Sequence, residues 1–260
     1  MGMSQSPALR IAALYRYPVK GLSPEALETA ELETSGYFPG DRLYAIENGP
    51  SGFNETVPRH LPKIAYLMLM RNEALARLRT RFDDATHRLT VEENGVQAVD
   101  ADLSTAEGRE ALAEFMKGFL PQELRAAPRV LTAPPGYRFT DSRTGYVSLI
   151  NRASVAATED LAGAPVDPLR FRGNLYLDGL EPWAELDMVG RVLEAGDARL
   201  KITSRTERCA ATNVDPQTGQ RDLSIPRTLM QGVGHTDCGV YAEVLAGGVL
   251  RTGDSLRVIG

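Results

Sequence analysis

Residues 191–204 read RVLEAGDARLKITS, and this stretch decides the fold class. Two short runs, 191–194 and 199–204, flank the turn-forming pair Gly196-Asp197, a pattern typical of two neighbouring strands. Similar runs follow at 240–245 and 255–259, and a second Gly-Asp pair precedes the last of them. This spacing predicts a mostly β protein, α+β in class, with two β-barrel-like lobes and helices at the periphery.

The first half of the chain is also rich in strand patterns. Apolar residues alternate from Leu9 to Tyr17, which predicts a strand with one buried face. Further strands are predicted at 43–47, 64–70, 89–91 and 96–99. The triplet Glu93-Asn94-Gly95 between the last two predicts a hairpin. Two helices are expected over these strands, one at 72–82 and one opened by the capping box Ser104–Glu107.

A proline-rich stretch without periodicity separates the two halves, so a boundary is expected between about 120 and 145. We predict an N-terminal lobe over 8–120 and a second lobe over 121–260. The second lobe is expected to open with a strand at 146–150, a helix at 154–161 and a strand at 171–177.

Composition limits the classes of function. The formal net charge of −5 argues against a broad nucleic-acid surface, because phosphate neutralisation needs clustered lysines and arginines. Only two cysteines occur, and no charged segment with an apolar segment behind it precedes the fold, so we expect a reducing, cytoplasmic setting. No apolar run approaches the roughly 20 residues that span a bilayer, so no membrane association is expected.

Cys209 is the most informative single residue. It is followed by NVDPQTG at 213–219, where Pro216 fixes φ for a turn and Gly219 permits a positive φ. We therefore expect Cys209 near a strand end, as a soft sulfur ligand. The alternative is a buried thiol that acts as a small hydrophobic residue.

Basic residues occur where the chain is expected to turn. Lys20 follows the first strand, Arg42 precedes the second, and Arg170 opens the strand predicted at 171–177. Arg170, Arg172 and Asn174 follow a period of two, so we expect them on one strand face. Guanidinium forks match phosphate, so three or four such cations could hold a phosphorylated cofactor. The alternative is a set of solvated surface charges.

Two further groups of residues give weaker indications of a site. Ser148, Asn151 and Ser154 lie at the predicted strand-to-helix transition, where backbone N–H groups could meet an anion, although capping alone accounts for Ser154. His235 and Cys238 suggest a metal or nucleophile site, but the ligands are too few for structural zinc, and no third residue is identifiable that would orient a Cys–His pair.

Five short motifs follow one another along the chain. They are Tyr-Pro-Val-Lys at 17–20, Asp-Arg at 41–42, Arg-Phe-Arg-Gly-Asn at 170–174, Arg-Cys at 208–209 and Val-Asp-Pro-Gln-Thr-Gly at 214–219. In these motifs the chain resembles the MOSC family, which includes the C-terminal domain of molybdenum cofactor sulfurase, the mitochondrial amidoxime-reducing components and bacterial proteins that detoxify N-hydroxylated bases. The resemblance spans nearly the whole chain, and residues 8 to about 120 are similar to the family's N-terminal β-barrel domain.

The resemblance implies a site for the molybdenum cofactor, Mo-molybdopterin. Cys209 would ligate molybdenum and act as the catalytic residue, and Arg208 would favour its deprotonated sulfur. The residues that would hold the pterin and its phosphate are Lys20, Arg42, Ser148, Ser154, Arg170, Arg172, Asn174 and Arg208. Two positions depart from the family's pattern, because Gly21 replaces the usual serine and Gly173 replaces a frequent proline.

Two functions are compatible with this resemblance. The first is an oxidoreductase that removes oxygen from N-hydroxylated small molecules. Two cysteines are too few for a four-thiolate iron–sulfur cluster, so its electrons would come from a separate protein of the flavoprotein or ferredoxin type. The second is a non-catalytic carrier of the cofactor, or of sulfur as a persulfide on Cys209, although the chain lacks the pyridoxal-phosphate module of true sulfurases.

Overall fold

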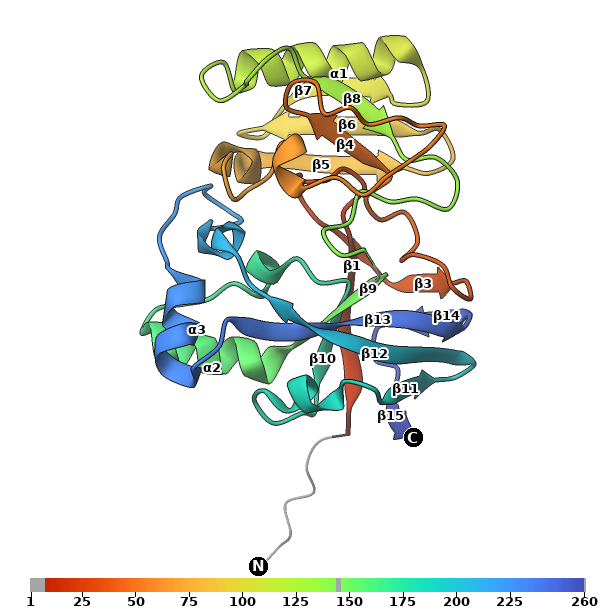
Figure 1. Cartoon of the computed structure of the whole chain (residues 1–260), viewed down its shortest axis with the longest axis vertical. Coiled ribbons are helices and arrows are strands. Elements are labelled where there is room, and N and C mark those ends of the chain that lie inside the picture. Colours follow the sequence, from red (N-terminus) through yellow and green to blue (C-terminus); the bar gives the residue numbers. More distant parts are fainter. Residues whose placement is uncertain (1–7, 144–145, 260) are drawn as a thin grey trace, which may run out of the picture.

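The computed structural model describes residues 8–143 and 146–259, which form two lobes (Figure 1). The lower lobe in this view holds an eight-stranded sheet, and the upper lobe holds two smaller sheets beneath helix α1 (Ala106–Phe119). The predicted class is confirmed, because the chain is mostly β, with curled, barrel-like sheets and peripheral helices.

The large sheet has the strand order β15-β11-β12-β13-β9-β10-β1-β2. Its strands are β1 (Arg10–Arg16), β2 (Glu25–Leu27), β9 (Val147–Asn151), β10 (Leu175–Asp178), β11 (Val192–Ala195), β12 (Ala198–Glu207), β13 (Asp237–Ala246) and β15 (Arg257–Ile259). Neighbours are antiparallel except β9 and β10, which helix α2 (Arg152–Ala162) joins in parallel as a crossover. The pairing of β11 with β12 confirms the two strands predicted within residues 191–204.

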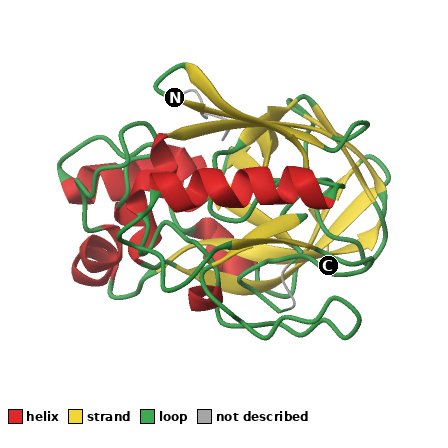
Figure 2. Ribbon diagram, turned by 90° about the horizontal axis from the view of Figure 1, so that it is seen from above, coloured by secondary structure: helices red, strands yellow, loops and turns green. Residues whose placement is uncertain are grey.

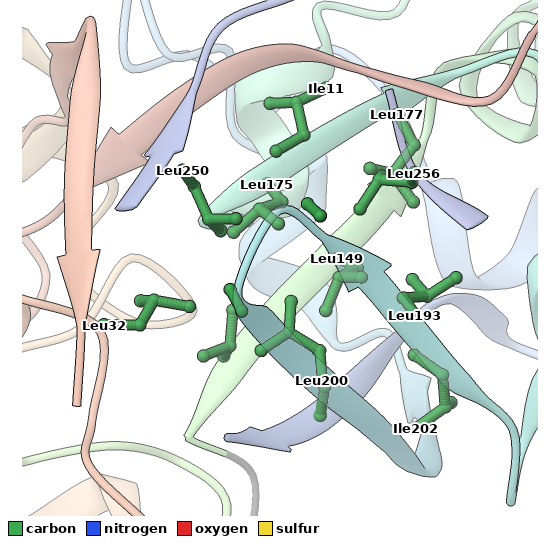
Figure 3. Close-up of a cluster of buried hydrophobic side chains, with 14 of the residues drawn as sticks. Ile11, Leu32, Leu149, Leu175, Leu177, Leu193, Leu200, Ile202, Leu250 and Leu256 are labelled. Atoms are coloured by element: carbon green, nitrogen blue, oxygen red, sulfur yellow. The ribbon is translucent and has the colours of Figure 1, made fainter. Parts of the chain in front are cut away.

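The main apolar core lies against one face of this sheet (Figure 3). Along β12, Ala198, Leu200 and Ile202 are buried while the residues between them are exposed, which is the alternation of a half-buried strand. Strand β14 (Gly248–Arg251) pairs with β3 (Thr29–Leu32) and adds Leu250 and Leu32 to the same core.

The upper lobe combines a three-stranded meander with a two-stranded sheet. The meander consists of β5 (Leu78–Asp83), β6 (Arg88–Glu93) and β7 (Val96–Asp102), and β4 (Tyr44–Glu47) pairs with β8 (Arg129–Thr132). The predicted hairpin is confirmed, because Asn94 and Gly95 both have positive φ between β6 and β7. Helix α1 lies across these strands and buries Leu112 and Met116 (Figures 1 and 2).

The helix starts show how local chemistry sets the boundaries. Thr105, rather than the predicted Ser104, caps α1, because its hydroxyl oxygen accepts the Gly108 N–H at 3.0 Å. Asn151 caps α2 in the same way. Helix α3 (Ile225–Val233), which the sequence analysis did not predict, lies beside α2 at one side of the lower lobe (Figure 1). No helix in the described parts of the chain has the length and apolarity to cross a membrane.

Three predicted elements differ from the structure. Residues 72–82 contain a short 3₁₀ turn followed by β5, because the segment from Leu78 pairs with β6 instead of continuing a helix. Residues 64–70 form no strand, and only Tyr66 makes an isolated bridge, to Glu47. In the range 171–177 the strand begins only at Leu175, because the 3₁₀ turn Pro168–Phe171 and the left-handed Arg172 that ends it come before the strand.

Candidate cofactor site

A cavity of about 400 Å³ lies where segments of both lobes meet. Lys63 of the upper lobe and the connecting segment 140–142 line one part of it, and the ends of β9 and β12 line another. The cavity brings together most of the predicted site residues, namely Arg42, Ser148, Arg170, Arg172, Asn174, Arg208 and Cys209.

The two cysteines have different surroundings. Cys209 follows β12, is partly exposed and lines the cavity, whereas Cys238 in β13 is fully buried. Burial raises the pKa of the Cys238 thiol to about 12. The small hydrophobic role that was the alternative for Cys209 therefore describes Cys238 instead.

The segment after Cys209 is held by its own hydrogen bonds. A 3₁₀ turn over Ala210–Asn213 begins at Cys209, and the Asp215 carboxylate then accepts the N–H groups of Gln217 and Thr218 at 2.8 and 2.7 Å. Gly219 has a φ of 73°, which confirms the expected positive-φ turn position. This closed turn fixes the chain on one side of the thiol.

Lys63 is a site residue that the sequence analysis missed. It lines the cavity with Cys209, and although burial lowers the pKa of its ammonium group, Cys209 and Asp141 raise it. Lys63 therefore keeps its positive charge beside the sulfur. No local pattern marks this lysine, because only the packing of the two lobes brings it to Cys209.

Arg42 and Arg172, which we call the ligand-facing pair, share an uncommon backbone conformation. Their φ angles are 48° and 52°, in the left-handed region that non-glycine residues rarely adopt. Arg42 donates hydrogen bonds to the Asp41 carboxylate and, at 3.3 Å, to the Arg172 carbonyl. In the described residues, the Arg172 guanidinium has neither a hydrogen bond nor an ion pair, although it is partly buried. Burial, together with the charge of Arg42, lowers the pKa of Arg172.

Arg170 and Arg208, which we call the anchoring pair, donate to protein oxygens from both terminal nitrogens of each guanidinium. The Arg170 side chain is 1% exposed and pairs with Asp215 and Asp222 at 3.1 and 2.7 Å. Arg208 donates to the carbonyl of Cys238 and, at 2.9 Å, to that of Phe171. These two arginines therefore hold the segments around Cys209, and the Arg170 Nε, which has no partner in the described residues, is buried.

Lys20 lies in a smaller adjoining cavity of about 60 Å³, which shares Arg42, Arg172 and Cys209 with the first. Its ammonium donates to the Phe139 carbonyl at 2.9 Å and pairs with Asp141. Burial lowers the pKa of Lys20 in spite of this pairing. Burial alone would raise the pKa of Asp141, but Lys20 and the nearby cations lower it to about 2.

The expectation that Arg170, Arg172 and Asn174 share one strand face is wrong. Arg170 belongs to the 3₁₀ turn η3 (Pro168–Phe171), Arg172 ends that turn, and Asn174 precedes β10. They line the same cavity because the turn bends the chain around it. The Asn174 side chain accepts the Ser148 N–H at 3.1 Å and donates to the Tyr15 carbonyl, so it links β9 to β1.

Ser154 lies outside the residues that line either cavity. Its buried hydroxyl donates to the Glu185 carboxylate at 2.8 Å and accepts the Trp183 N–H. The Glu185 carboxylate also accepts the Asn151 amide and the Gly239 N–H. Ser154 therefore helps to satisfy a buried carboxylate that joins α2 to β13.

The side chains that line the main cavity suit a metal ion that a cofactor already coordinates. Across residues 8–143 and 146–259, no group of three His, Cys, Asp or Glu side chains could hold a metal ion. A metal at Cys209 therefore needs further ligands from a cofactor. A thiol suits a soft metal and an unpaired guanidinium suits a phosphate, so Cys209 and Arg172 fit the two ends of a metallated, phosphorylated group.

Comparison with known proteins shows the family to which the chain belongs. The model of the MOSC N-terminal beta barrel domain matches residues 8–123, and that of the MOSC domain matches residues 136–257. Human mitochondrial amidoxime-reducing component 1 is 23% identical over 96% of this chain and 83% of its own length. Molybdenum cofactor sulfurase of Caenorhabditis elegans is 24% identical over 85% of this chain, which spans 31% of the sulfurase.

Among solved structures, YiiM from Geobacillus stearothermophilus is 23% identical and aligns over 45% of this chain and 55% of its own, with a TM-score of 0.35. The two family models together extend over nearly all of the sequence. The chain belongs to the MOSC family, with the N-terminal beta barrel domain ahead of the MOSC domain.

Proposed function

We propose that this protein binds a molybdenum cofactor and reduces N-hydroxylated small molecules with electrons from a separate protein. The observation that carries the proposal is that the accessible Cys209 thiol and the unpaired Arg172 guanidinium line one cavity. The name of the human relative, an amidoxime-reducing component, supports the choice of a reductase. An electron donor of the flavoprotein or ferredoxin type is part of the proposal, as is a cytoplasmic setting.

Some of the predicted site residues would contact the cofactor, and others hold the protein segments around it. Cys209 would bind the metal, Arg42 and Arg172 would bind the phosphate, and Ser148 would offer its hydroxyl to the organic part. Lys20 would add positive charge from the adjoining cavity. The supporting residues, which hold the surrounding segments, are Arg170, Asn174 and Arg208. Ser154 is not included, because its hydroxyl serves Glu185.

The reaction needs protons as well as electrons. Conversion of R–NHOH to R–NH2 and water consumes two electrons and two protons, and the bound cofactor would supply the two-electron exchange at its metal. Lys63 holds a proton on Nζ beside Cys209, and its pKa is raised by that neighbour and by Asp141 against the lowering effect of burial. Its positive charge would stabilise negative charge on the departing oxygen.

The competing function is a carrier of the cofactor or of sulfur, and the match to a molybdenum cofactor sulfurase is the observation that favours it. A carrier would use Cys209 as an attachment point without turnover. The two functions share the binding site, so turnover with an added reductase separates them.

The test uses full-length protein from a host that makes the cofactor, with molybdenum measured per chain and reduction of benzamidoxime followed with an added electron donor. We expect Cys209→Ala to lose most of its molybdenum and all turnover. Cys238→Ala removes the buried cysteine as the matched control and should keep both. Full molybdenum retention by Cys209→Ala would overturn metal binding by this thiol, and metal-loaded wild type without turnover would favour the carrier.

A further inference from the structure

Tyr17 is a fully buried aromatic residue directly beneath the ligand-facing arginines. Its ring lies 4.2 Å from the Arg172 guanidinium carbon and 4.8 Å from that of Arg42, measured to the ring centroid. Its exposed fraction is 0%. Within the described residues, the Tyr17 hydroxyl lies near Tyr176 but makes no hydrogen bond of good geometry, so the ring is the part of the side chain that contacts the site.

The backbone ties Tyr17 to the same arginines. The Arg42 N–H donates to the Tyr17 carbonyl at 2.8 Å, and the Tyr17 N–H donates to the Asp41 carboxylate at 2.8 Å. That carboxylate also pairs with the Arg42 guanidinium. Ring, backbone and guanidinium therefore form one connected unit at the end of β1.

The Tyr17 ring in this unit reduces the electrostatic repulsion between the guanidinium groups of Arg42 and Arg172. Two guanidinium groups that bind one anion repel each other before the anion arrives, and the Arg42 charge contributes to the lowered pKa of Arg172. The negative face of an aromatic ring attracts cations, most strongly where water is excluded. A buried ring in contact with both groups therefore offsets part of their repulsion and restricts their rotamers.

We propose that Tyr17 is a positioning residue, an aromatic platform that holds Arg42 and Arg172 together on one phosphate group. The inference rests on the proposed function only in taking the anion to be a phosphate monoester. It adds a role for the tyrosine of the Tyr-Pro-Val-Lys motif, whose side chain lies outside the residues that line the cavities.

The test measures binding of inorganic phosphate to the cofactor-free protein by calorimetry, with chemical shifts of the arginine side-chain N–H groups as a second readout. Tyr17→Phe keeps the ring and should bind phosphate within about twofold of wild type. Tyr17→Leu removes the ring, and its dissociation constant should rise about tenfold, in line with the loss of two desolvated cation–π contacts. Phe82→Leu removes a buried ring outside the cavity and controls for general loss of packing.

Each outcome has a separate meaning. Weak binding by Tyr17→Leu, with normal binding by Tyr17→Phe and Phe82→Leu, would support the platform. Wild-type affinity in a folded Tyr17→Leu would overturn it and leave the proposed function standing. Equal weakening by Tyr17→Leu and Phe82→Leu would also overturn it, because packing alone would then explain the effect. Absence of phosphate binding by the wild type would count against the proposed function itself.

Discussion

The ligand-facing and anchoring arginines line the same cavity but differ in their hydrogen bonds, most of all at Arg172. Both terminal nitrogens of Arg170 and of Arg208 donate to carboxylate or carbonyl oxygens of the protein, and the buried Arg170 Nε has no partner in the described residues. Arg172 has no such partner in the described residues, and Arg42 binds only its neighbour Asp41 and the Arg172 carbonyl. The difference teaches that a guanidinium on a cavity wall marks a ligand site only when the fold leaves its donors free.

The largest expected effect is on the anchoring side. Arg170→Ala would leave Asp215 and Asp222 without their buried partner, so we expect the free energy of unfolding to fall by about 3 kcal/mol, the lower end for a broken buried pair because both acids are partly exposed. Urea denaturation measures this loss.

Arg205→Ala is the matched control for that loss. Arg205 lines the same cavity but is 43% exposed and pairs with an exposed Asp187, so its removal should change stability by less than about 1 kcal/mol. Similar losses for the two variants would contradict the distinction between an anchoring arginine and a surface one.

For the ligand-facing pair we expect a small change in stability and a large loss of phosphate binding. Arg172→Ala removes no side-chain hydrogen bond among residues 8–143 and 146–259, so we expect a stability change below about 1 kcal/mol. Phosphate binding should weaken about tenfold or more with the loss of charge-assisted bonds. Calorimetry and urea denaturation on the same samples measure both quantities. Arg172→Lys keeps the charge without the fork and should fall between wild type and alanine. An alanine variant that unfolds as easily as Arg170→Ala would place Arg172 in the anchoring pair.

Sequence patterns predicted most strands of the large sheet, and most of the residues that they singled out line the main cavity, but they did not predict the hydrogen-bond partners of those residues. Alternating apolar residues locate β12, because burial on one face of a sheet imposes a period of two. The strand predicted from Leu9 to Tyr17 is present as β1, but its burial does not alternate, because the pairing register with β10 shifts after Ile11. The roles depend on distant partners, since Arg170 pairs with Asp222, 52 positions away. Lys63 and Asp141 have no local signal, because only lobe packing brings them to the cavity.

A smaller expected effect concerns backbone strain at Arg172. Arg172 has a φ of 52°, and a side chain in the left-handed region is disfavoured relative to glycine. Arg172→Gly should therefore be about 1 kcal/mol more stable than Arg172→Ala, as thermal unfolding can measure. His87, at φ 53° in an exposed turn outside the cavity, gives the control pair His87→Gly and His87→Ala. A gain at His87 without one at Arg172 would show that the cavity accepts this backbone without strain.

The smallest effect concerns Asp141, the acid that the protein itself contributes beside the ligand-facing pair. Its pKa is lowered from 3.8 to about 2, because Lys20 and nearby cations outweigh the effect of burial. A lowered folded-state pKa stabilises the protein above the unfolded value, and this contribution disappears as the pH falls from about 4 to about 2. The side chain is 51% exposed, so solvent screening should keep the contribution below about 1 kcal/mol.

We therefore expect wild type to be slightly more stable than Asp141→Asn at pH 5, with the difference in the free energy of unfolding shrinking toward pH 2 in urea titrations. A difference that stays constant over this range would mean that Asp141 acts through packing and not through its charge.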